Sequence, residues 1–429
     1  MKNIKFGCFL TIWLGQFISG IGSGLTAFSM GIFAFNHTKS ATAYSLTVLF
    51  AFLPAYLLKP IGGALSDRFD RRIMMIIGDL GSALGLMFIL LMFFAGIHEL
   101  WVIYLGVAAS SVFVALQNPA YKASLTDLLD EKAYAKGSGL MQLSEAARFV
   151  FSPIIAGFLM LILKIEYILM IDIVTFIVAA WLVLAVKSKI KNETREVKNG
   201  NLISEIIIGF NYTFSNKGLV WLLLITSVIT FTIGFLQALI GPFILSFADA
   251  KTLGIAQTIS ATGMLVSSFS IGIFAKTKKH LKILVPSLLI SGVFFGMFGI
   301  TTNIVIIVAT GFVFFASLPF INTSLEVLIR KNVDNAVQGR VWSIVSLISQ
   351  LGMILAFSIA GFLADRVFNP LLLADGLLAS TVGQLIGTGN GRGIGLMFVL
   401  SGITIIMTGV AISKNKAIKA LELSLSENQ

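Results

Sequence analysis

The sequence predicts an all-α, polytopic membrane protein whose 12 transmembrane helices form two pseudo-symmetric six-helix bundles. The first observation is composition: 57% of the 429 residues are hydrophobic and 12% are charged, whereas soluble chains are about one-quarter charged. The second is that apolar runs of about 20 residues, the length that spans a bilayer, recur along the chain. The third is an internal repeat. The runs are continuous and lack the alternation of a membrane β-barrel, so we expect helices.

The predicted spans follow the apolar runs in order. The first run is much too long for a signal-peptide core, so we expect it to be retained as the first span. The run from 283 to 329 is too long for one span, and Thr301, Thr302 and Asn303 are the expected turn within it. The predicted spans are 6–34, 43–65, 73–96, 101–121, 136–162, 167–187, 218–247, 252–275, 281–300, 303–329, 338–365 and 393–412.

A polar segment divides these spans six and six. We expect an N-terminal six-helix bundle at 1–187, a cytoplasmic linker at 188–217 and a C-terminal six-helix bundle at 218–429. Apolar residues recur at helical spacing within the linker, which predicts a short helix on the membrane surface. They are Leu202, Ile203, Ile206, Ile207 and Phe210.

The basic residues set the expected topology. Most of the 31 Lys and Arg residues lie in the connections on one side of the membrane. Because Lys and Arg concentrate in cytoplasmic connections, we expect both termini in the cytoplasm of a cell with this protein in its plasma membrane. The opposite connections hold Lys39, Lys164, Lys251, Arg366 and Arg392, and two further basic residues, Lys59 and Arg148, fall inside spans.

The two halves of the chain resemble each other. The segment "LTDLLDEKAYAKGSGLMQLSEAA" of the first half corresponds to "LEVLIRKNVDNAVQGRVWSIVSLIS" of the second, and each carries a glycine, Gly137 or Gly339, in its charged connection. The pentapeptide "IAGFL" occurs at 155–159 and again at 359–363. Two parallel six-span repeats are typical of transporters that hold their substrate near the membrane midplane.

Several functional classes are disfavoured. The connection at 366–392 contains "GTGNGRGIG" but follows no strand and fits neither a dinucleotide-binding nor a P-loop spacing, so we expect a mobile loop and no ATP hydrolysis. The single cysteine and three scattered histidines give no disulfide framework and no metal site. We expect no cofactor, and no nucleic acid despite the net charge of +11, because the basic residues lie between apolar runs.

The stretch "GGALSDRFDRR" between the second and third spans concentrates charge in an apolar chain. It resembles the signature of the major facilitator superfamily, with Asp70 where the general pattern has glycine, a change that is familiar from the macrolide-efflux-like branch. "WLGQFISGIGS", "IGDLGSA", "NPAYKASLTDLL", "MIDIVTF", "NKGL" and "NVDNAVQGRVWS" are similar to that branch too. The matching signature residues are Gly63, Asp67, Arg68, Asp70, Arg71 and Arg72.

This resemblance implies a non-enzymatic secondary active transporter that works by alternating access. The expected function is proton-coupled efflux of hydrophobic or amphipathic, macrolide-like drugs by a bacterial antiporter that confers antibiotic resistance. The alternatives are export of a siderophore or other metabolite, and lipid flipping. The implied partners are a small-molecule substrate, protons and the lipid bilayer, and we expect a monomer.

The antiporter motif of the fifth span is only partly present. Gly139, Pro153 and Gly157 match it, whereas Arg148, Ser152 and Ala156 stand at glycine positions. Glu145 and Arg148 lie three residues apart near the expected midplane, where a charge costs at least about 2.5–3.5 kcal/mol. Either Glu145 alternates between Arg148, a proton and a cationic substrate, or the two form a structural ion pair.

The other charges are assigned to gates or structure. The expected cytoplasmic gate contains the signature residues together with Asp79, Gly339 and Arg340. The resemblance implies that Asp67, at the end of the second span, faces the cytoplasmic start of the eleventh span. Asp79 could pair with a basic residue of the signature. For Asp172 we expect Lys164 or a helix terminus as partner. Glu326 and Arg330 have the spacing of a solvated pair.

The resemblance implies that spans one, four, seven and ten line a central cavity. Uncharged polar residues on these spans are candidates for substrate contact, and each is as likely to bond to a neighbouring helix. They are Gln16, Gln117, Asn118, Gln237 and Asn322.

Overall fold

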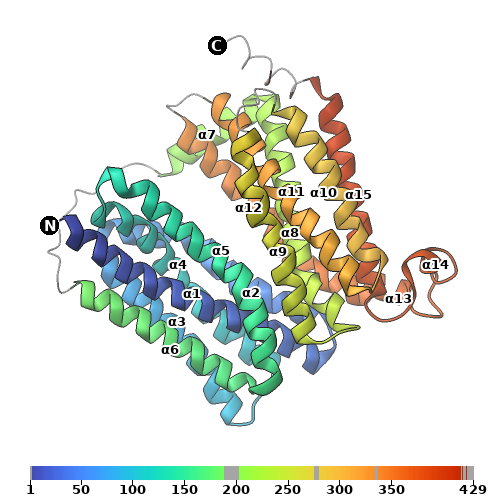
Figure 1. Cartoon of the computed structure of the whole chain (residues 1–429), viewed down its shortest axis with the longest axis horizontal. Helices are drawn as coiled ribbons and strands as arrows, with labels where there is room; N and C mark the ends of the chain where they lie inside the picture. Colours follow the sequence, from blue (N-terminus) through green and yellow to red (C-terminus); the bar gives the residue numbers. More distant parts are fainter. Residues whose placement is uncertain are drawn as a thin grey trace. The chain divides into compact units, whose positions relative to one another are not determined.

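The computed structural model describes residues 2–187, 202–274, 280–333, 337–416, 418 and 422 (Figure 1). The chain divides into two compact units, the first made of residues 1–198 and the second of most of residues 199–429. The helices of the first unit are α1 (Lys2–Thr38), α2 (Ala41–Arg68), α3 (Arg71–Phe94), α4 (Leu100–Leu128), α5 (Glu131–Ile162) and α6 (Ile165–Lys187).

The second unit begins with a short helix and contains six long ones. Its helices are α7 (Leu202–Ser215), α8 (Lys217–Leu245), α9 (Ala250–Phe274), α10 (Leu281–Ile300), α11 (Ile304–Lys331), α12 (Gln338–Leu363), the π-helical turn η1 (Ala364–Phe368), α13 (Asn369–Leu371), α14 (Val382–Ile386) and α15 (Arg392–Lys414).

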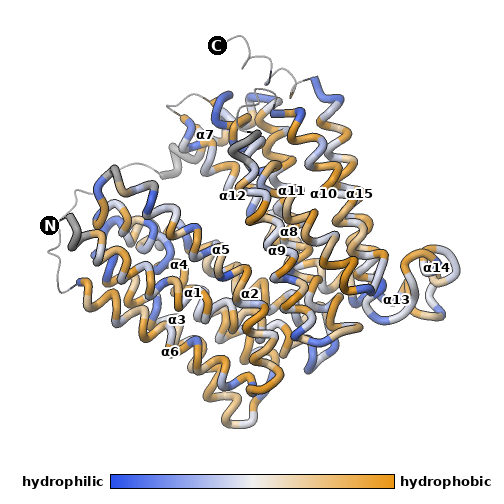
Figure 2. The backbone as a smooth tube through the Cα atoms, viewed as in Figure 1, coloured by the Kyte–Doolittle hydropathy of each residue, from blue (hydrophilic) through white to orange (hydrophobic). Residues whose placement is uncertain are grey.

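The prediction of 12 helical spans is confirmed. Within the described residues, 11 helices are long and apolar enough to cross a membrane, and α9, with 25 residues, is the twelfth long helix. Figure 2 shows hydrophobic residues along the lengths of the helices, with hydrophilic residues mostly near their ends and in the connections. The predicted turn at Thr301–Asn303 separates α10 from α11.

Two helix ends differ most from the sequence prediction. The prediction ended the fourth span at 121 and began the fifth at 136, whereas α4 continues to Leu128 and α5 begins at Glu131. Hydropathy marks where a helix leaves the hydrocarbon, but the backbone hydrogen-bond ladder continues into water without an apolar environment. The charged connection between these helices is therefore much shorter than predicted.

Polar side chains define several helix starts. Asn303 caps α11 by accepting from the N–H of Val305 at 3.0 Å, and Asn216 caps α8 by accepting from Gly218 at 2.9 Å. Asp70 caps α3 by accepting from the N–H of Arg72 at 2.9 Å. Asn and Asp are favoured at such positions because their oxygens satisfy backbone donors of the first turn. Asp70 therefore has a local structural role in addition to any role in a gate.

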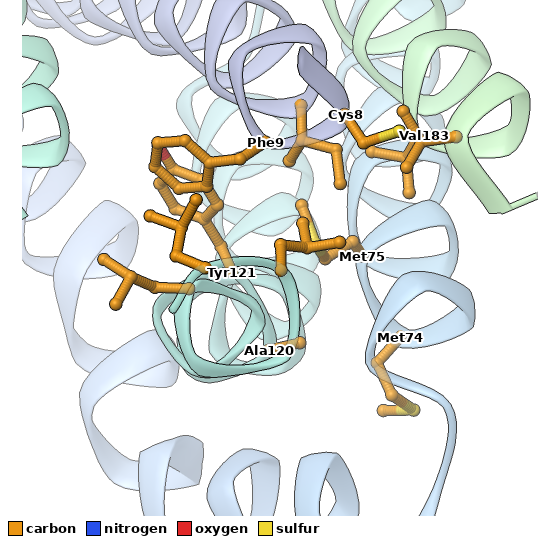
Figure 3. Close-up of a cluster of buried hydrophobic side chains, with 12 residues drawn as sticks. Cys8, Phe9, Met74, Met75, Ala120, Tyr121 and Val183 are labelled. Atoms are coloured by element: carbon orange, nitrogen blue, oxygen red, sulfur yellow. The ribbon is translucent and has the colours of Figure 1, made fainter. Parts of the chain in front are cut away.

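The first unit has a buried cluster that joins α1, α3, α4 and α6 (Figure 3). Phe9 of α1 and Met75 of α3 are fully buried in it, and Tyr121 of α4 and Val183 of α6 complete the contact. Cys8 belongs to the same cluster and is 6% exposed. The polar residues Gln16, Asp79 and Gln117, described below, lie within four residues of members of this cluster.

Glycines let α10 and α15 pack closely in the second unit. A Cβ on Gly299 would fall on the backbone of Gly395, and one on Gly292 would lie 2.7 Å from the carbonyl oxygen of Gly402. Small residues allow such close backbone approach between membrane helices. The contact between α10 and α15 is therefore sensitive to the addition of a single methyl group.

The predicted surface helix of the linker is present as α7, although linker residues 188–201 lie outside the described part. Gly209 of α7 packs against the backbone of Arg340 near the start of α12. On other faces of α7, Ile207 is 52% exposed and Phe210 is 47% exposed. This helix thus keeps apolar side chains outside the packed unit, as a helix at a lipid surface does.

The connection between α12 and α15 is folded, in contrast to the mobile loop that its glycines suggested. Gly387, Gly389 and Gly391 have φ values of 93°, 114° and 80°, which explains the glycine-rich sequence because other residues rarely adopt this region. Arg392 is 6% exposed and donates to the carbonyls of Gly299 and Ile300, each at 3.0 Å, and of Ile386. This arginine ties the connection to the end of α10.

Candidate functional site

Polar side chains gather inside the first unit, on the helices that also form its apolar core. Asp79 of α3 and Asp172 of α6 are each only 1% exposed. A buried carboxylate is costly unless it is paired or hydrogen-bonded, so each such group in a membrane helix marks a candidate functional or structural site.

Asp79 is part of a buried network with two amide side chains. Gln16 of α1 donates through Nε2 to Asp79 Oδ2 at 2.9 Å, and Gln117 of α4 donates to Gln16 Oε1. Gly78 makes this possible, because a Cβ there would clash with Gln117 and keep α3 away from α4. The network ties α1, α3 and α4 together.

This network changes the interpretation of three predicted residues. We expected Asp79 to pair with a basic residue of the signature, but its hydrogen-bond partner is Gln16. Gln16 and Gln117 were candidates for substrate contact and are 8% and 9% exposed. Their amides instead hydrogen-bond to each other and to Asp79. This is the second possibility that we gave for these residues, a hydrogen bond to a neighbouring helix.

The network makes a prediction for stability. Asp79→Leu leaves the buried amide of Gln16 without its acceptor and should lower the free energy of unfolding by about 1–3 kcal/mol. Asp79→Asn keeps an acceptor of the same shape and should stay within about 1 kcal/mol of the native protein. Denaturation in detergent measures both. A loss in Asp79→Asn as large as that in Asp79→Leu would show that the network requires the negative charge itself.

Asp172 lies in a second polar group, seven residues from the start of α6. Ser23 of α1 donates to its Oδ1 at 3.5 Å, and Thr175 of α6 donates to the same oxygen at 3.3 Å. The expected partners were Lys164 or a helix terminus, and the structure shows neither at this carboxyl. Arg148 of α5 is instead close enough to interact electrostatically with it.

Glu145 and Arg148 lie near the middle of α5, which has 32 residues. Glu145 is exposed and Arg148 is half-buried. Neither forms an ion pair with the other or with any further described residue. The structural ion pair that we considered is therefore absent from this conformation, and Arg148 lies between an exposed and a buried carboxyl group.

The signature residues form a charged cluster at the junction of α2, α3 and α4. Arg71 Nη1 donates to Asp127 Oδ1 at 2.8 Å and to the carbonyl of Ala123 at 2.7 Å. Arg71 also lies 3.6 Å from Asp67 Oδ1. Asp127 was not among the predicted site residues. It could have been found, because an acidic residue at the end of an apolar span, on the same side as an arginine-rich connection, is a candidate partner for those arginines.

The remaining signature residues differ in their surroundings. The glycine that allows close packing is Gly62, whose Cβ would meet the carbonyl of Ala115, whereas a Cβ on Gly63 would meet nothing within 4 Å. Arg68 is exposed and Arg72 is buried. Asp67 is 68% exposed despite its proximity to Arg71, so its carboxylate stays available to another partner.

The predicted residues of the second unit lie apart from one another. Glu326 and Arg330 of α11 form the expected i,i+4 pair, with 2.7 Å between Oε1 and Nη2. Asn322 is exposed one turn before Glu326, and Gln237 of α8 is half-buried. Gly339 is exposed and Arg340 is half-buried. Asn118, on α4 of the first unit, is exposed like Asn322.

The chemistry of these groups is that of ion pairing and hydrogen bonding. The described residues contain no cluster of three or more His, Cys, Asp or Glu side chains that could hold a metal ion. Carboxyl and guanidinium groups in membrane helices can bind protons and charged substrates and can exchange partners. The first unit therefore carries the groups that a coupled exchange of cations would need.

Comparison with known proteins agrees with this arrangement. The model of the Major Facilitator Superfamily matches residues 12–357. Macrolide efflux protein A of Streptococcus pyogenes is 27% identical over 376 residues, which is 86% of this chain and 93% of that protein. Macrolide efflux protein A of Enterococcus faecalis is 26% identical over 319 residues, covering 73% and 98%. The crystal structure of the nucleoside transporter NupG superposes with a TM-score of 0.73 at 14% identity, covering 95% of this chain and 100% of that one.

Proposed function

Because the chain belongs to the Major Facilitator Superfamily, it is a membrane transporter and not an enzyme, and we propose that it exports amphipathic cationic drugs of the macrolide type in exchange for protons. The names of the two relatives support export of such compounds. We propose a monomer in the bacterial plasma membrane with both termini in the cytoplasm. The two six-helix bundles, 1–187 and 218–429, would alternate access, joined by the linker at 188–217.

One observation carries the proposal of exchange: Glu145 is an exposed carboxylate in the middle of a membrane helix, without an ion-pair partner among the described residues. A carboxylate in that position requires a cation during the working cycle, since an unpaired charge is costly there. A proton, Arg148 and a cationic substrate are cations that could satisfy it in turn. Neutralising Glu145 should therefore remove the site for a cationic substrate.

We propose further that Asp67 contributes to the cytoplasmic gate together with Gly339 and Arg340. A carboxylate at a helix N-terminus is favoured by about 0.3–1 kcal/mol, and Val337, the N-cap residue of α12, has an apolar side chain that cannot cap the helix. The exposure of Asp67 supports this role. Asn118, Gln237 and Asn322 remain the candidates for uncharged contact with the substrate.

The test is a substrate screen in proteoliposomes with an imposed pH gradient, using macrolides and lipophilic cationic dyes. We expect the native protein to accumulate these cations against their own concentration gradient, driven by the pH gradient. We expect the transport rate of Glu145→Gln to be lower by at least about tenfold, which is equivalent to the loss of one 1.4 kcal/mol interaction. Glu99→Gln, the same chemical change at an exposed position before α4, should transport normally.

Two results would contradict the proposal. Full proton-driven transport by Glu145→Gln would remove this carboxylate from the exchange. Absence of any pH-driven transport of cations by the native protein, together with transport of a siderophore or rapid lipid flipping, would favour one of the other transport activities.

A further inference from the structure

Asp172 is held in a pocket of hydroxyl groups at the junction of α1, α5 and α6. Besides Ser23 and Thr175, Thr26 of α1 lies close to the carboxyl group, although its own hydroxyl does not reach hydrogen-bond geometry with it. Hydroxyl groups at 3.3–3.5 Å are weak partners for a negative charge, because charge-assisted hydrogen bonds are normally shorter, about 2.5–2.7 Å for O–H···O⁻. These hydroxyls carry no charge that could balance a carboxylate at Asp172, so the balancing cation must be Arg148 or a proton.

The close approach of the three helices depends on small residues of α1. A Cβ on Gly22 would lie 2.8 Å from Asp172 Oδ1, and one on Gly24 would lie 3.2 Å from Cγ of Arg148. Ser152 of α5, which stands at a glycine position of the antiporter motif, donates to the carbonyl of Ile21 at 3.1 Å. These residues bring Arg148 to the same level of α1 as Asp172.

Arg148 is consequently the cation that both carboxyl groups can use. It interacts electrostatically with Asp172 and is one helical turn from Glu145, a spacing at which side chains of a helix meet. No described residue forms an ion pair with Arg148. The charged group that acts on Asp172 is Arg148, and the other polar groups near it are the hydroxyls of Ser23, Thr26 and Thr175. Helix α3 also packs against α6, and it meets the residues on either side of Asp172 with apolar side chains.

We propose that Asp172 binds the transported proton, and that Arg148 moves between Asp172 and Glu145 as this proton is released and taken up. The proposal rests on the exporter function above and assigns the two partners of the exchange to different carboxyl groups. Glu145, being exposed, holds the cationic substrate, and Asp172, being buried, holds the proton.

The exchange follows from charge balance. When Asp172 releases its proton to water, its carboxylate attracts Arg148, and Glu145 is left as an exposed carboxylate that binds the cationic substrate. When Asp172 takes up a proton from water on the other side, Arg148 is released, pairs with Glu145 and displaces the substrate. Only the O–H bond of Asp172 forms and breaks, and the two cations are held alternately.

The first experiment measures proton release on binding of tetraphenylphosphonium, a lipophilic cation, to purified protein in weakly buffered detergent. The native protein should release about one proton for each cation bound, by linkage between the two sites. Asp172→Asn should bind the cation and release none. Glu99→Gln, the loss of an exposed carboxylate before α4, should release protons as the native protein does. Normal release by Asp172→Asn would overturn the proposal.

The second experiment needs no substrate. Infrared difference spectra between acidic and alkaline pH should show the C=O band of a protonated carboxylic acid that is lost in Asp172→Asn and kept in Asp79→Asn. A nearby positive charge favours the ionised form of a carboxyl group by about one pH unit or more. In Arg148→Met, which lacks this charge, the band should therefore persist to a pH that is higher by about one unit or more. Arg148→Lys keeps the charge and should behave as the native protein does. A band with the same pH dependence in Arg148→Met would overturn the proposal.

The two experiments separate this proposal from the exporter function. If the native protein neither binds nor transports tetraphenylphosphonium, export of lipophilic cations is wrong, and the infrared titration still decides whether Asp172 changes its protonation under control of Arg148. If transport is proton-driven and Asp172→Asn keeps it so, the exporter function stands and the role of Asp172 is wrong.

Discussion

Arg71→Met should abolish transport and lower the free energy of unfolding by about 1.5–3 kcal/mol, the contribution of hydrogen bonds to a charged group that is partly shielded from water. The Arg71 side chain is 11% exposed, and Asp127 is 30% exposed. The guanidinium of Arg71 is the common partner of Asp127, Asp67 and the carbonyl of Ala123. Methionine keeps the stem of the side chain but removes the guanidinium, so the ends of α2, α3 and α4 lose the hydrogen bonds and the ion pairs that Arg71 makes with them.

Transport in proteoliposomes and unfolding in detergent measure the two effects separately. Asp67→Asn is the matched control, because Asp67 is 68% exposed and 3.6 Å away, and such solvated pairs contribute about 0–1 kcal/mol. It should fold as the native protein and impair only transport, through the proposed gate. Native stability of Arg71→Met would mean that the cluster contributes nothing to the folded unit.

Gly299→Ala should destabilise the second unit by more than about 3 kcal/mol, at or above the upper end of ordinary overpacking. The new methyl group would occupy the position of the Gly395 carbonyl group. The backbone of residue 299 fixes the position of the Cβ, and the atoms that it meets belong to the backbone of Gly395, so neither side can move aside by a change of rotamer. The helices α10 and α15 would have to separate, which would also disturb the carbonyls of Gly299 and Ile300 that hold Arg392.

Gly296→Ala on the same helix is the control. A Cβ there would lie 3.8 Å from Val399, which is ordinary van der Waals contact. We expect this variant to unfold at the temperature of the native protein and Gly299→Ala to unfold at a clearly lower one. Equal melting temperatures for the two variants would contradict the packing that we describe for α10 and α15.

Hydropathy was sufficient to predict the helices because each span must be apolar over the thickness of the bilayer, whatever its neighbours are. The turn between α10 and α11 was found for the same reason, since Asn303 interrupts an apolar run. The extended ends of α4 and α5 were missed because helices continue beyond the hydrocarbon. A span predicted by hydropathy is therefore a lower bound on its helix.

The partners of the polar residues were harder to predict. Gln16 and Asp79 are 63 residues apart, and their contact depends on the rotation and relative height of two helices, which hydropathy does not specify. The same holds for Arg148 and Asp172, because the approach of α5 and α6 is set by glycines of α1. The sequence was sufficient to identify the charged residues inside membrane spans, but the partners predicted for Asp79 and Asp172 were wrong.

The burial of Arg392 could not be predicted for a different reason. By sequence it is one basic residue in a glycine-rich connection, with nothing to distinguish it from a solvated arginine. Its burial depends on backbone carbonyls at the end of α10, about 90 residues earlier in the chain. Backbone acceptors leave no signal in the sequence.

The only cysteine of the chain lies in the apolar cluster that joins α1, α3, α4 and α6. Because Cys8 is 6% exposed and thiol reagents need access to a thiolate, the native chain should react slowly with them and can serve as its own labelling background. Cysteines introduced at exposed positions of the connections, such as Lys164 and Thr302, could then carry spin labels without further substitutions. Distances between such labels, recorded at different proton and drug concentrations, would report the working cycle directly.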